Sequence, residues 1–367
     1  MALLKDLSVD GKGYYGIGAS AVEKKDDLYT YLRITDIRDD GTLNLGELKS
    51  VDDPDAGKYL LKPNDIVFAR TGASTGRNYF YDGSDGIFVY AGFLIKFSID
   101  PQKVNPQYVK YYCKSEQYRN WISSFSTGST RGNINAQTLG NMDIPIPSRE
   151  QQDFLVSVLA PLDAKIKHND KINDNLQQQA QAIYASMFIA NADPAWTQGH
   201  LSDLITVKYG KDHKKLADGV YPVFGSGGIM RYVERPLYTG ESVLIPRKGT
   251  LNNVMYVNEP FWSVDTMFFT EMKVPNVAKF VFHFVKAKDL ASMNAGSAVP
   301  SMTTDILNAL ELAIPPADRL AEFESAVAPM YQMMQANSQE SAKLAELRDT
   351  LLPKLMSGTI DVSSIQI

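Results

Sequence analysis

The second half of this chain repeats the first half at a constant offset. Gly296 matches Gly128, 168 positions earlier (296 minus 128), and the match runs without a gap from 128–187 to 296–355. A unit this long, present only twice, cannot form a solenoid, which stacks several short repeats to bury a core. The repeat therefore predicts a pseudo-symmetric molecule, and one use of such symmetry is to read two half-sites.

The composition bounds the class of protein. With 367 residues, 44% hydrophobic and 22% charged, the chain is long enough for two or three domains with their own cores. One cysteine and four scattered histidines predict no metal site. The start lacks a signal-peptide pattern and no apolar run reaches the ~20 residues of a membrane span, so we expect a cytoplasmic protein with no membrane partner. The net charge of −5 argues mildly against nucleic acid, unless basic residues cluster in loops.

Patterning divides the chain into four segments. Residues 1–147 and 191–315 carry short apolar, β-branched and aromatic runs between turn residues, which is typical of mixed α/β domains. Each of these segments also has one expected helix, near 106–121 and 275–289. The other two segments, 148–190 and 316–367, are almost free of glycine and predict long helices. The predicted strands cover 65–69, 86–90, 93–97, 242–245, 253–257 and 266–269.

The expected helices, 148–188 and 316–356, have apolar residues at alternating steps of three and four. This a/d seam, which begins at Leu155 in one helix and at Phe323 in the other, predicts helices packed along their lengths. A helix of about 40 residues is ~60 Å long and acts as a spacer. Pro161 and Pro329 lie at equivalent points of the repeat, where each removes a backbone hydrogen bond, so each segment is either one kinked helix or two shorter ones. We favour the kinked helix because the seam spacing continues through the proline. The fold class predicted is two pseudo-repeated α/β domains separated by two long antiparallel coiled-coil helices.

Asn169 and Asn337 occupy the same seam position in the two helices. A polar seam residue lowers stability but fixes register when it meets another polar group. In an antiparallel pair these two asparagines would face one another, whereas the alternative is that both point to solvent.

Two loops that each follow a predicted strand combine small, hydroxyl and basic residues. Small residues let backbone N–H groups approach phosphate, while Arg, Lys and Asn side chains bond to phosphates or base edges. The alternative for either loop alone is a plain hairpin connection, but paired basic loops favour binding. The candidate DNA-binding residues are Arg70, Thr71, Ser74, Thr75 and Arg77 in the first loop, and Arg247, Lys248, Asn252 and Asn253 in the second.

A second pair of loops, at 126–133 and 294–301, precedes the long helices. Its Gly-Ser core could bind DNA or could simply cap the next element. The second copy lacks an arginine, so two half-sites would read differently. The further candidates are Ser129, Thr130, Arg131 and Asn133, with Ser297 and Ser301 in the second copy.

No residue set predicts catalysis. Residues 224–228 and 258–261 are near misses to the glycine and Asn-Pro-Pro-aromatic motifs of amino-methyltransferases, but Ser226 and Glu259 replace motif residues. Glu271 and Lys273 could mimic part of a nuclease centre but fit an alternating strand edge better. We therefore expect no catalytic residue, no metal and no cofactor bound by this chain.

Together these features resemble the DNA-specificity subunits of type I restriction–modification systems. The resemblance covers nearly the whole chain, and its most specific part is the end of the second helix. Gly132 is a departure, because the family often has proline there. The motifs that carry the resemblance are Tyr31-Leu-Arg-Ile-Thr-Asp-Ile37, Asn64-Asp-Ile-Val-Phe-Ala-Arg-Thr-Gly72, residues 128–133, 144–147 and 221–228, and Leu347-Arg-Asp-Thr-Leu-Leu-Pro-Lys-Leu-Met-Ser-Gly-Thr-Ile360.

The resemblance implies a non-catalytic subunit that reads a bipartite, asymmetric target in double-stranded DNA through two target-recognition domains. It implies a complex with two methyltransferase subunits, which methylate adenine N6, and with restriction subunits. S-adenosylmethionine, ATP and Mg are expected on those partner subunits. The alternatives are a methylation-only specificity subunit, an N6-adenine methyltransferase, or a coiled-coil scaffold without DNA readout.

Overall fold

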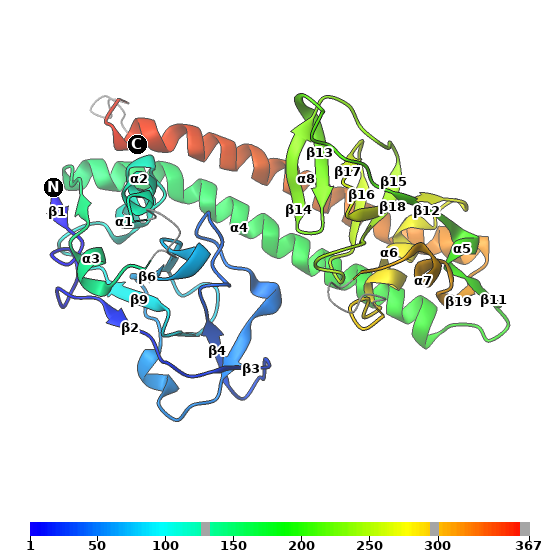
Figure 1. Ribbon diagram of the computed structural model, residues 1–367, viewed down its shortest axis with the longest axis horizontal. Coiled ribbons are helices and arrows are strands. Elements are labelled where there is room, and N and C mark those ends of the chain that lie inside the picture. The colour runs from blue at the N-terminus through cyan, green and yellow to red at the C-terminus, as the bar shows by residue number, and fades with distance from the viewer. Residues whose placement is uncertain (126–132, 294–300, 360–367) are drawn as a thin grey trace. The chain divides into compact units, whose positions relative to one another are not determined.

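The computed structural model describes residues 1–125, 133–293 and 301–359, which fold into two compact units. Unit 1 comprises Met1–His168 and Glu340–Ile367, and unit 2 comprises Asn169–Gln339. Both long helices pass from one unit into the other (Figure 1). This division therefore cuts through both helices, and the four predicted segment boundaries stay a prediction. Within the described part of the chain, no helix is long and apolar enough to cross a membrane.

Unit 1 is built from short strands in three sheets. One sheet pairs β1 with β10, a second has the order β2-β9-β6-β7 with every pair antiparallel, and a third has the order β3-β5-β4-β8 with β4 and β8 parallel. The strands are β1 (Ala2–Leu3), β2 (Tyr14–Tyr15), β3 (Ala21–Val22), β4 (Tyr29–Leu32), β5 (Lys49–Val51), β6 (Asp65–Ala69), β7 (Asn78–Tyr81), β8 (Phe88–Tyr90), β9 (Leu94–Ser98) and β10 (Asp143–Ile144).

Unit 1 also contains short helices between its strands and before α4. The α-helices are α1 (Pro106–Tyr112), α2 (Glu116–Ser123) and α3 (Ala136–Gly140), with 3-10 turns at η1 (Leu45–Glu47), η2 (Ala56–Tyr59) and η3 (Gly72–Ser74). The single helix expected near 106–121 is wrong in one respect, because it is two helices. Ser115 accepts a hydrogen bond from the Tyr118 N–H and so caps α2, which starts a new helix there.

Unit 2 repeats this plan. β11 pairs with β19, one sheet has the antiparallel order β12-β18-β15-β16, and another has the order β14-β13-β17. The strands are β11 (Thr197–His200), β12 (Ile205–Tyr209), β13 (Asp218–Gly225), β14 (Gly228–Val233), β15 (Glu241–Pro246), β16 (Met255–Asn258), β17 (Trp262–Ser263), β18 (Met267–Met272) and β19 (Glu311–Ile314). The helices are α5 (Leu201–Leu204), α6 (Ala278–Lys286) and α7 (Thr304–Asn308).

Two long helices complete the fold. α4 spans Arg149–Ala185 and is followed by a π-helical turn, η4 (Ser186–Ala190), while α8 spans Ala317–Met356. Each continues through its internal proline, as the unbroken seam predicts, and Figure 1 shows each as one coil. α8 ends two residues before Gly358, whose φ of 71° suits glycine, so the predicted glycine stop is confirmed.

The long helices are antiparallel within each unit. In unit 1, Asp163 lies beside Arg348 with an Oδ1 to Nη1 distance of 3.0 Å, and Lys165 lies beside Glu340 at 3.2 Å. In unit 2, Asn169 donates to the main-chain oxygen of Asn337 at 3.4 Å. The Asn337 side chain donates to Oδ1 of Asn173 at 2.9 Å. The antiparallel arrangement predicted from the seam is therefore confirmed, and the two seam asparagines lie together.

Each unit has its own apolar core, to which the long helices contribute. In unit 1, Leu4, Leu155 and Leu352 are buried in one cluster, so the turn after β1, helix α4 and helix α8 share a core. Cys113, the one cysteine of the chain, lies in this cluster, and burial raises the pKa of its thiol. The core of unit 2 is richer in aromatic rings, with Phe188 packed edge-on against Phe323 at a centroid distance of 5.1 Å.

Candidate nucleic-acid interface

The two candidate loops of unit 1 meet at the end of β6. Thr71 and Asn133 form an antiparallel bridge, and the Ile134 N–H donates to the Arg70 oxygen at 2.9 Å. The first loop makes a tight turn through η3, where the Thr75 hydroxyl donates to the Gly72 oxygen at 2.8 Å. Asn133, the described end of the second candidate loop, thus lies beside the first loop.

Unit 2 brings its loops together in the same way. Lys248 and Ser301 form an antiparallel bridge, and the Met302 N–H donates to the Arg247 oxygen at 2.9 Å. Ser301 is 168 positions after Asn133, the offset of the repeat. Lys248 is exposed to solvent. The same junction therefore occurs in both copies, at the end of β6 in one and of β15 in the other.

Several of the predicted side chains bond to neighbouring protein groups and so stabilise the loops, instead of projecting into solvent. Nε of Arg77 pairs with Asp39 at 2.6 Å, and its Nη1 donates to the Ile37 oxygen. In unit 2, the Asn252 amide donates to Asp289 at 3.1 Å and the Asn253 amide donates to the Ser226 oxygen at 2.7 Å. These bonds make the three residues supports of the loops, while Thr71, Ser74, Asn133, Lys248 and Ser301 remain at least partly exposed. Ser129, Thr130, Arg131 and Ser297 lie outside the described residues.

The turn between β13 and β14 belongs to this edge of unit 2. It contains Ser226, whose oxygen accepts from Asn253, and Gly228, whose φ of 112° requires glycine. A Cβ placed on Gly227 or Gly228 would meet nothing within 4 Å, so a ligand can approach the backbone there. Sequence reasoning considered 224–228 only as a defective methyltransferase motif, although its glycines also signal a hairpin turn.

Two tyrosines that the sequence did not single out also lie at these edges. The guanidinium of Arg70 stacks over the ring of Tyr15 at 5.2 Å, and that of Arg247 over the ring of Tyr209 at 5.5 Å. Both rings are about half exposed. Each tyrosine is the last residue of an edge strand, β2 in one copy and β12 in the other. A tyrosine at the end of the equivalent strand in both copies is the sequence signal that could have identified them.

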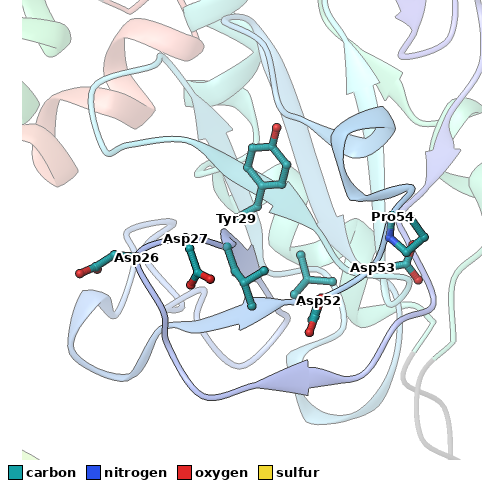
Figure 2. Close-up of a pocket in the computed structure, with 8 residues that line it drawn as sticks. Asp26, Asp27, Tyr29, Asp52, Asp53 and Pro54 are labelled. Atoms are coloured by element: carbon teal, nitrogen blue, oxygen red, sulfur yellow. The ribbon is translucent and has the colours of Figure 1, made fainter.

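A pocket on the β3-β5-β4-β8 sheet of unit 1 is lined by acidic residues, in contrast to the basic candidate loops. Asp26, Asp27, Asp52 and Asp53 are among the residues that line this pocket of about 550 Å³ (Figure 2). Carboxylates repel DNA phosphates, so this surface is a poor place for a duplex to approach. In the described part of the chain, no three His, Cys, Asp or Glu residues are grouped to hold a metal ion.

The remaining enzyme-like patterns have ordinary structural places. Asn258 ends β16, and Phe261 is buried opposite Tyr238 in a bridge. Glu271 lies on β18, where it pairs with Lys208 at 3.4 Å, as the alternating strand edge predicts.

Comparison with known proteins gives a consistent result. The family described as type I restriction modification DNA specificity domain matches residues 19–178 and 195–321. The type I restriction enzyme MjaIX specificity subunit of Methanocaldococcus jannaschii is 22% identical, over 71% of this chain and 70% of that protein. The HindI specificity subunit of Haemophilus influenzae is 21% identical over 86% and 90%. The crystal structure of a type I restriction–modification S subunit from M. genitalium superposes with a TM-score of 0.56 and 19% identity, covering 96% of this chain and 94% of that one.

Proposed function

This chain belongs to the type I restriction–modification DNA-specificity family, and we propose that each of its units reads one half of a split target in double-stranded DNA. The observation that carries the proposal is the repeated loop junction, Thr71 with Asn133 and Lys248 with Ser301. Each junction places backbone and polar side chains at one sheet edge, which is the arrangement that reading base edges requires.

The halves of the target are expected to differ. The exposed junction side chains are unlike in the two copies, with Thr71, Ser74 and Asn133 in unit 1 and Lys248 and Ser301 in unit 2. Because base discrimination depends on the donors and acceptors that each loop presents, unlike loops read unlike sequences. The bipartite site is therefore asymmetric.

Catalysis belongs to partner subunits in this proposal. Two methyltransferase subunits would hold S-adenosylmethionine and methylate adenine N6, and restriction subunits would use ATP and Mg. This chain would supply the sequence and the spacing between half-sites. The isolated chain is then expected to bind DNA weakly, since a net charge of −5 offers little general attraction to phosphate.

Methylome sequencing tests the proposal directly. A host that expresses this chain with its methyltransferase subunits should gain methylated adenines in one split motif, and the same host without this chain should lose them. Methylation by the purified chain alone, or a continuous motif, would contradict the proposal.

Variants of single junction residues separate the two readers. We expect Asn133→Ala to relax only one half of the motif and Lys248→Ala only the other, because a lost base contact removes about 1–3 kcal/mol of discrimination at one position. Equal loss in both halves from either variant would contradict separate reading.

The spacing is tested through the long helices. α4 and α8 contain 37 and 40 residues, or ~56–60 Å at 1.5 Å per residue. Insertion of four residues, about one turn, into both helices should keep both half-motifs and widen the gap between them. An unchanged gap would exclude the helices as the ruler.

A further inference from the structure

We propose that Arg70 with Tyr15, and Arg247 with Tyr209, form one repeated element that grips a DNA phosphate in each half-site without reading sequence. This inference rests on the proposed function and divides the labour within the interface. The loops would contact base edges, and the stacked arginines would fix the distance and orientation of the duplex relative to each unit.

The strand register of unit 1 puts this arginine and this tyrosine on one face of the sheet. Tyr15 and Phe68 both lie opposite Ile95, on either side of β9. Arg70 follows Phe68 by two positions, so its side chain leaves the same face of the sheet. The long arginine side chain crosses the central strand and reaches the ring at 5.2 Å.

Unit 2 reproduces this register at positions with a different spacing in the sequence. Tyr209 and Ile245 both lie opposite Phe268, on either side of β18. Arg247 follows Ile245 by two positions and stacks over Tyr209 at 5.5 Å. The tyrosine and the arginine are 55 positions apart in unit 1 (70 minus 15) and 38 in unit 2 (247 minus 209). The geometry has therefore been kept although the connecting segments differ in length.

Backbone hydrogen bonds hold each arginine from both sides. The arginine N–H donates to the turn residue just before β9 or β18, and its oxygen accepts from the residue that follows the second candidate loop. The partners are Phe93 (3.1 Å) and Ile134 (2.9 Å) for Arg70, and Thr266 and Met302 (both 2.9 Å) for Arg247. The guanidinium is thus anchored at its base before any ligand arrives, which reduces the ordering entropy that binding requires.

Neither guanidinium has a carboxylate partner within residues 1–125, 133–293 and 301–359. Nε of Arg70 is buried without a hydrogen bond in the described structure, while Nη1 of Arg247 reaches only a main-chain oxygen, that of Asp265. Six other arginines are each paired with a carboxylate, namely Arg33, Arg77, Arg149, Arg231, Arg319 and Arg348. Arg38, Arg119 and Arg235 also have no carboxylate partner in the described part of the chain, but they do not stack on a tyrosine at a repeated position. A partly buried, stacked guanidinium with spare donors is suited to an anion with several acceptor oxygens.

Phosphate is favoured over a base edge because the element is the same in both units. Two readers of unlike sequences need unlike base contacts, whereas the phosphate backbone is the same at both half-sites. A feature shared by both units therefore serves the shared part of the ligand. The exposed rings of Tyr15 and Tyr209 hold the guanidinium planes and leave their edges to the phosphate oxygens.

The test uses the full chain in complex with its methyltransferase subunits and a pool of random-sequence duplexes, so that no target need be known. We expect Arg70→Ala and Arg247→Ala each to weaken binding about tenfold. Each should also lower the slope of log K against log salt by about 0.9, the value for one lost phosphate contact. The methylated motif should stay the same.

Matched variants separate this role from a general charge or folding effect. Arg319→Ala removes an arginine that pairs with Glu322 on α8 and should leave binding and slope unchanged. Arg70→Lys, which keeps the charge, should lose less than Arg70→Ala, and Tyr209→Phe, which keeps the ring under Arg247, should match the wild type. Thermal unfolding of each variant checks the fold, and Arg70→Lys remains informative if Arg70→Ala does not fold.

The outcomes are distinct. A changed half-motif in Arg70→Ala or Arg247→Ala would make the arginine a base reader and overturn the inference. Wild-type affinity and salt slope in both variants would overturn it as well. If the wild-type complex itself methylates no split motif, the proposed function fails instead, whatever the arginine variants do.

Discussion

The two units attach an equivalent helix to the long helices by different chemistry. In unit 1, the Asp163 carboxylate of α4 forms ion pairs with Lys110 of α1 at 2.8 Å and with Arg348 of α8 at 3.0 Å. Lys114 lies at 3.7 Å from the same carboxylate. In unit 2 the position 168 residues after Asp163 is Tyr331, whose hydroxyl meets Nε2 of His283 at 2.9 Å. At this position the shared carboxylate of one copy is thus replaced by an uncharged contact in the other, where α6 is held to α8 by a separate ion pair between Lys279 and Glu324 at 2.6 Å.

The titration behaviour of the two attachments differs accordingly. Burial opposes ionisation of Asp163, but Lys114, Lys110 and Arg348 overcome it and hold the pKa of the carboxyl below its usual range. Burial, with a smaller contribution from Lys286, lowers the pKa of His283 to about 4. The comparison teaches that the repeat preserves the positions of contacts while the charge placed there, and so the response to pH, has diverged.

The largest effect is expected from Asp163→Asn. It leaves three partly buried cations without their common carboxylate and should lower the free energy of unfolding by about 3 kcal/mol. Asp153→Asn is the matched control on the same helix, because Asp153 pairs with Arg149 in an exposed ion pair worth under about 1 kcal/mol. Urea unfolding, with amide hydrogen exchange of α1, measures both. Equal losses in the two variants would show that unit 1 is not held by this cluster.

The next largest effect is expected on acidification, which should lower the stability of unit 2 before that of unit 1. Unfolded His283 takes up a proton near its ordinary pKa of 6.5, but folded His283 does so only near 4, so stability falls as pH drops through this window. At pH 5 the loss in unit 2 is about 2 kcal/mol. The contribution of Asp163 persists until pH falls below the ordinary carboxyl pKa of about 3.9, because its folded pKa is lowered.

Hydrogen exchange of α6 and α1 at pH 7 and pH 5, corrected for intrinsic rates, follows the two units in one sample. We expect α6 to lose protection and α1 to keep it. His283→Gln should abolish the acid-induced loss in α6. If α1 weakened equally, or the variant still responded, the pH difference would have another origin.

Tyr331→Phe should have a smaller effect, about 1 kcal/mol, because it removes one hydroxyl and leaves the Nδ1 contact of His283 with Gln181 at 2.7 Å. Tyr232→Phe, at a half-exposed ring of the same unit, should be neutral. Denaturant unfolding decides the point, and a loss as large as that of Asp163→Asn would remove the contrast between the units.

The smallest effect concerns the seam asparagines of unit 2. We expect Asn169→Leu with Asn337→Leu to raise the free energy of unfolding by about 0.5 kcal/mol and to loosen helix register, because the apolar seam gains area while Asn173 loses a donor. Cysteine cross-linking at successive seam positions measures register. A single cross-linking register in the double variant would deny the asparagines this role.

Local patterns in the sequence carried much of this fold. The three- and four-residue steps from Leu155 and Phe323 predicted the long helices because helix periodicity depends only on near neighbours. The predicted strand at 65–69 coincides with β6 for the same reason. The break at Ser115 was missed because a capping serine inside an apolar pattern resembles an ordinary helix position.

The pairing of distant segments could not be predicted. Nothing near Thr71 specifies a bridge to Asn133, and nothing near Tyr15 specifies an arginine 55 positions later (70 minus 15), because these contacts follow from strand order. Asp163 likewise looks like any polar position of a helix until α1 brings Lys110 to it. Candidate residues could therefore be named by residue type, whereas their position beside one another, or in a supporting hydrogen bond, required the sheet register.

Cys113 is buried, and burial raises the pKa of its thiol, so it supplies little thiolate. The wild-type chain should therefore react very little with thiol-labelling reagents. Two new cysteines, at exposed Gln117 on α2 and exposed Gln198 on β11, would then carry a donor and an acceptor dye without a competing site. Energy transfer between them would give the distance between the units in solution and would follow, in real time, any change when duplex DNA is added.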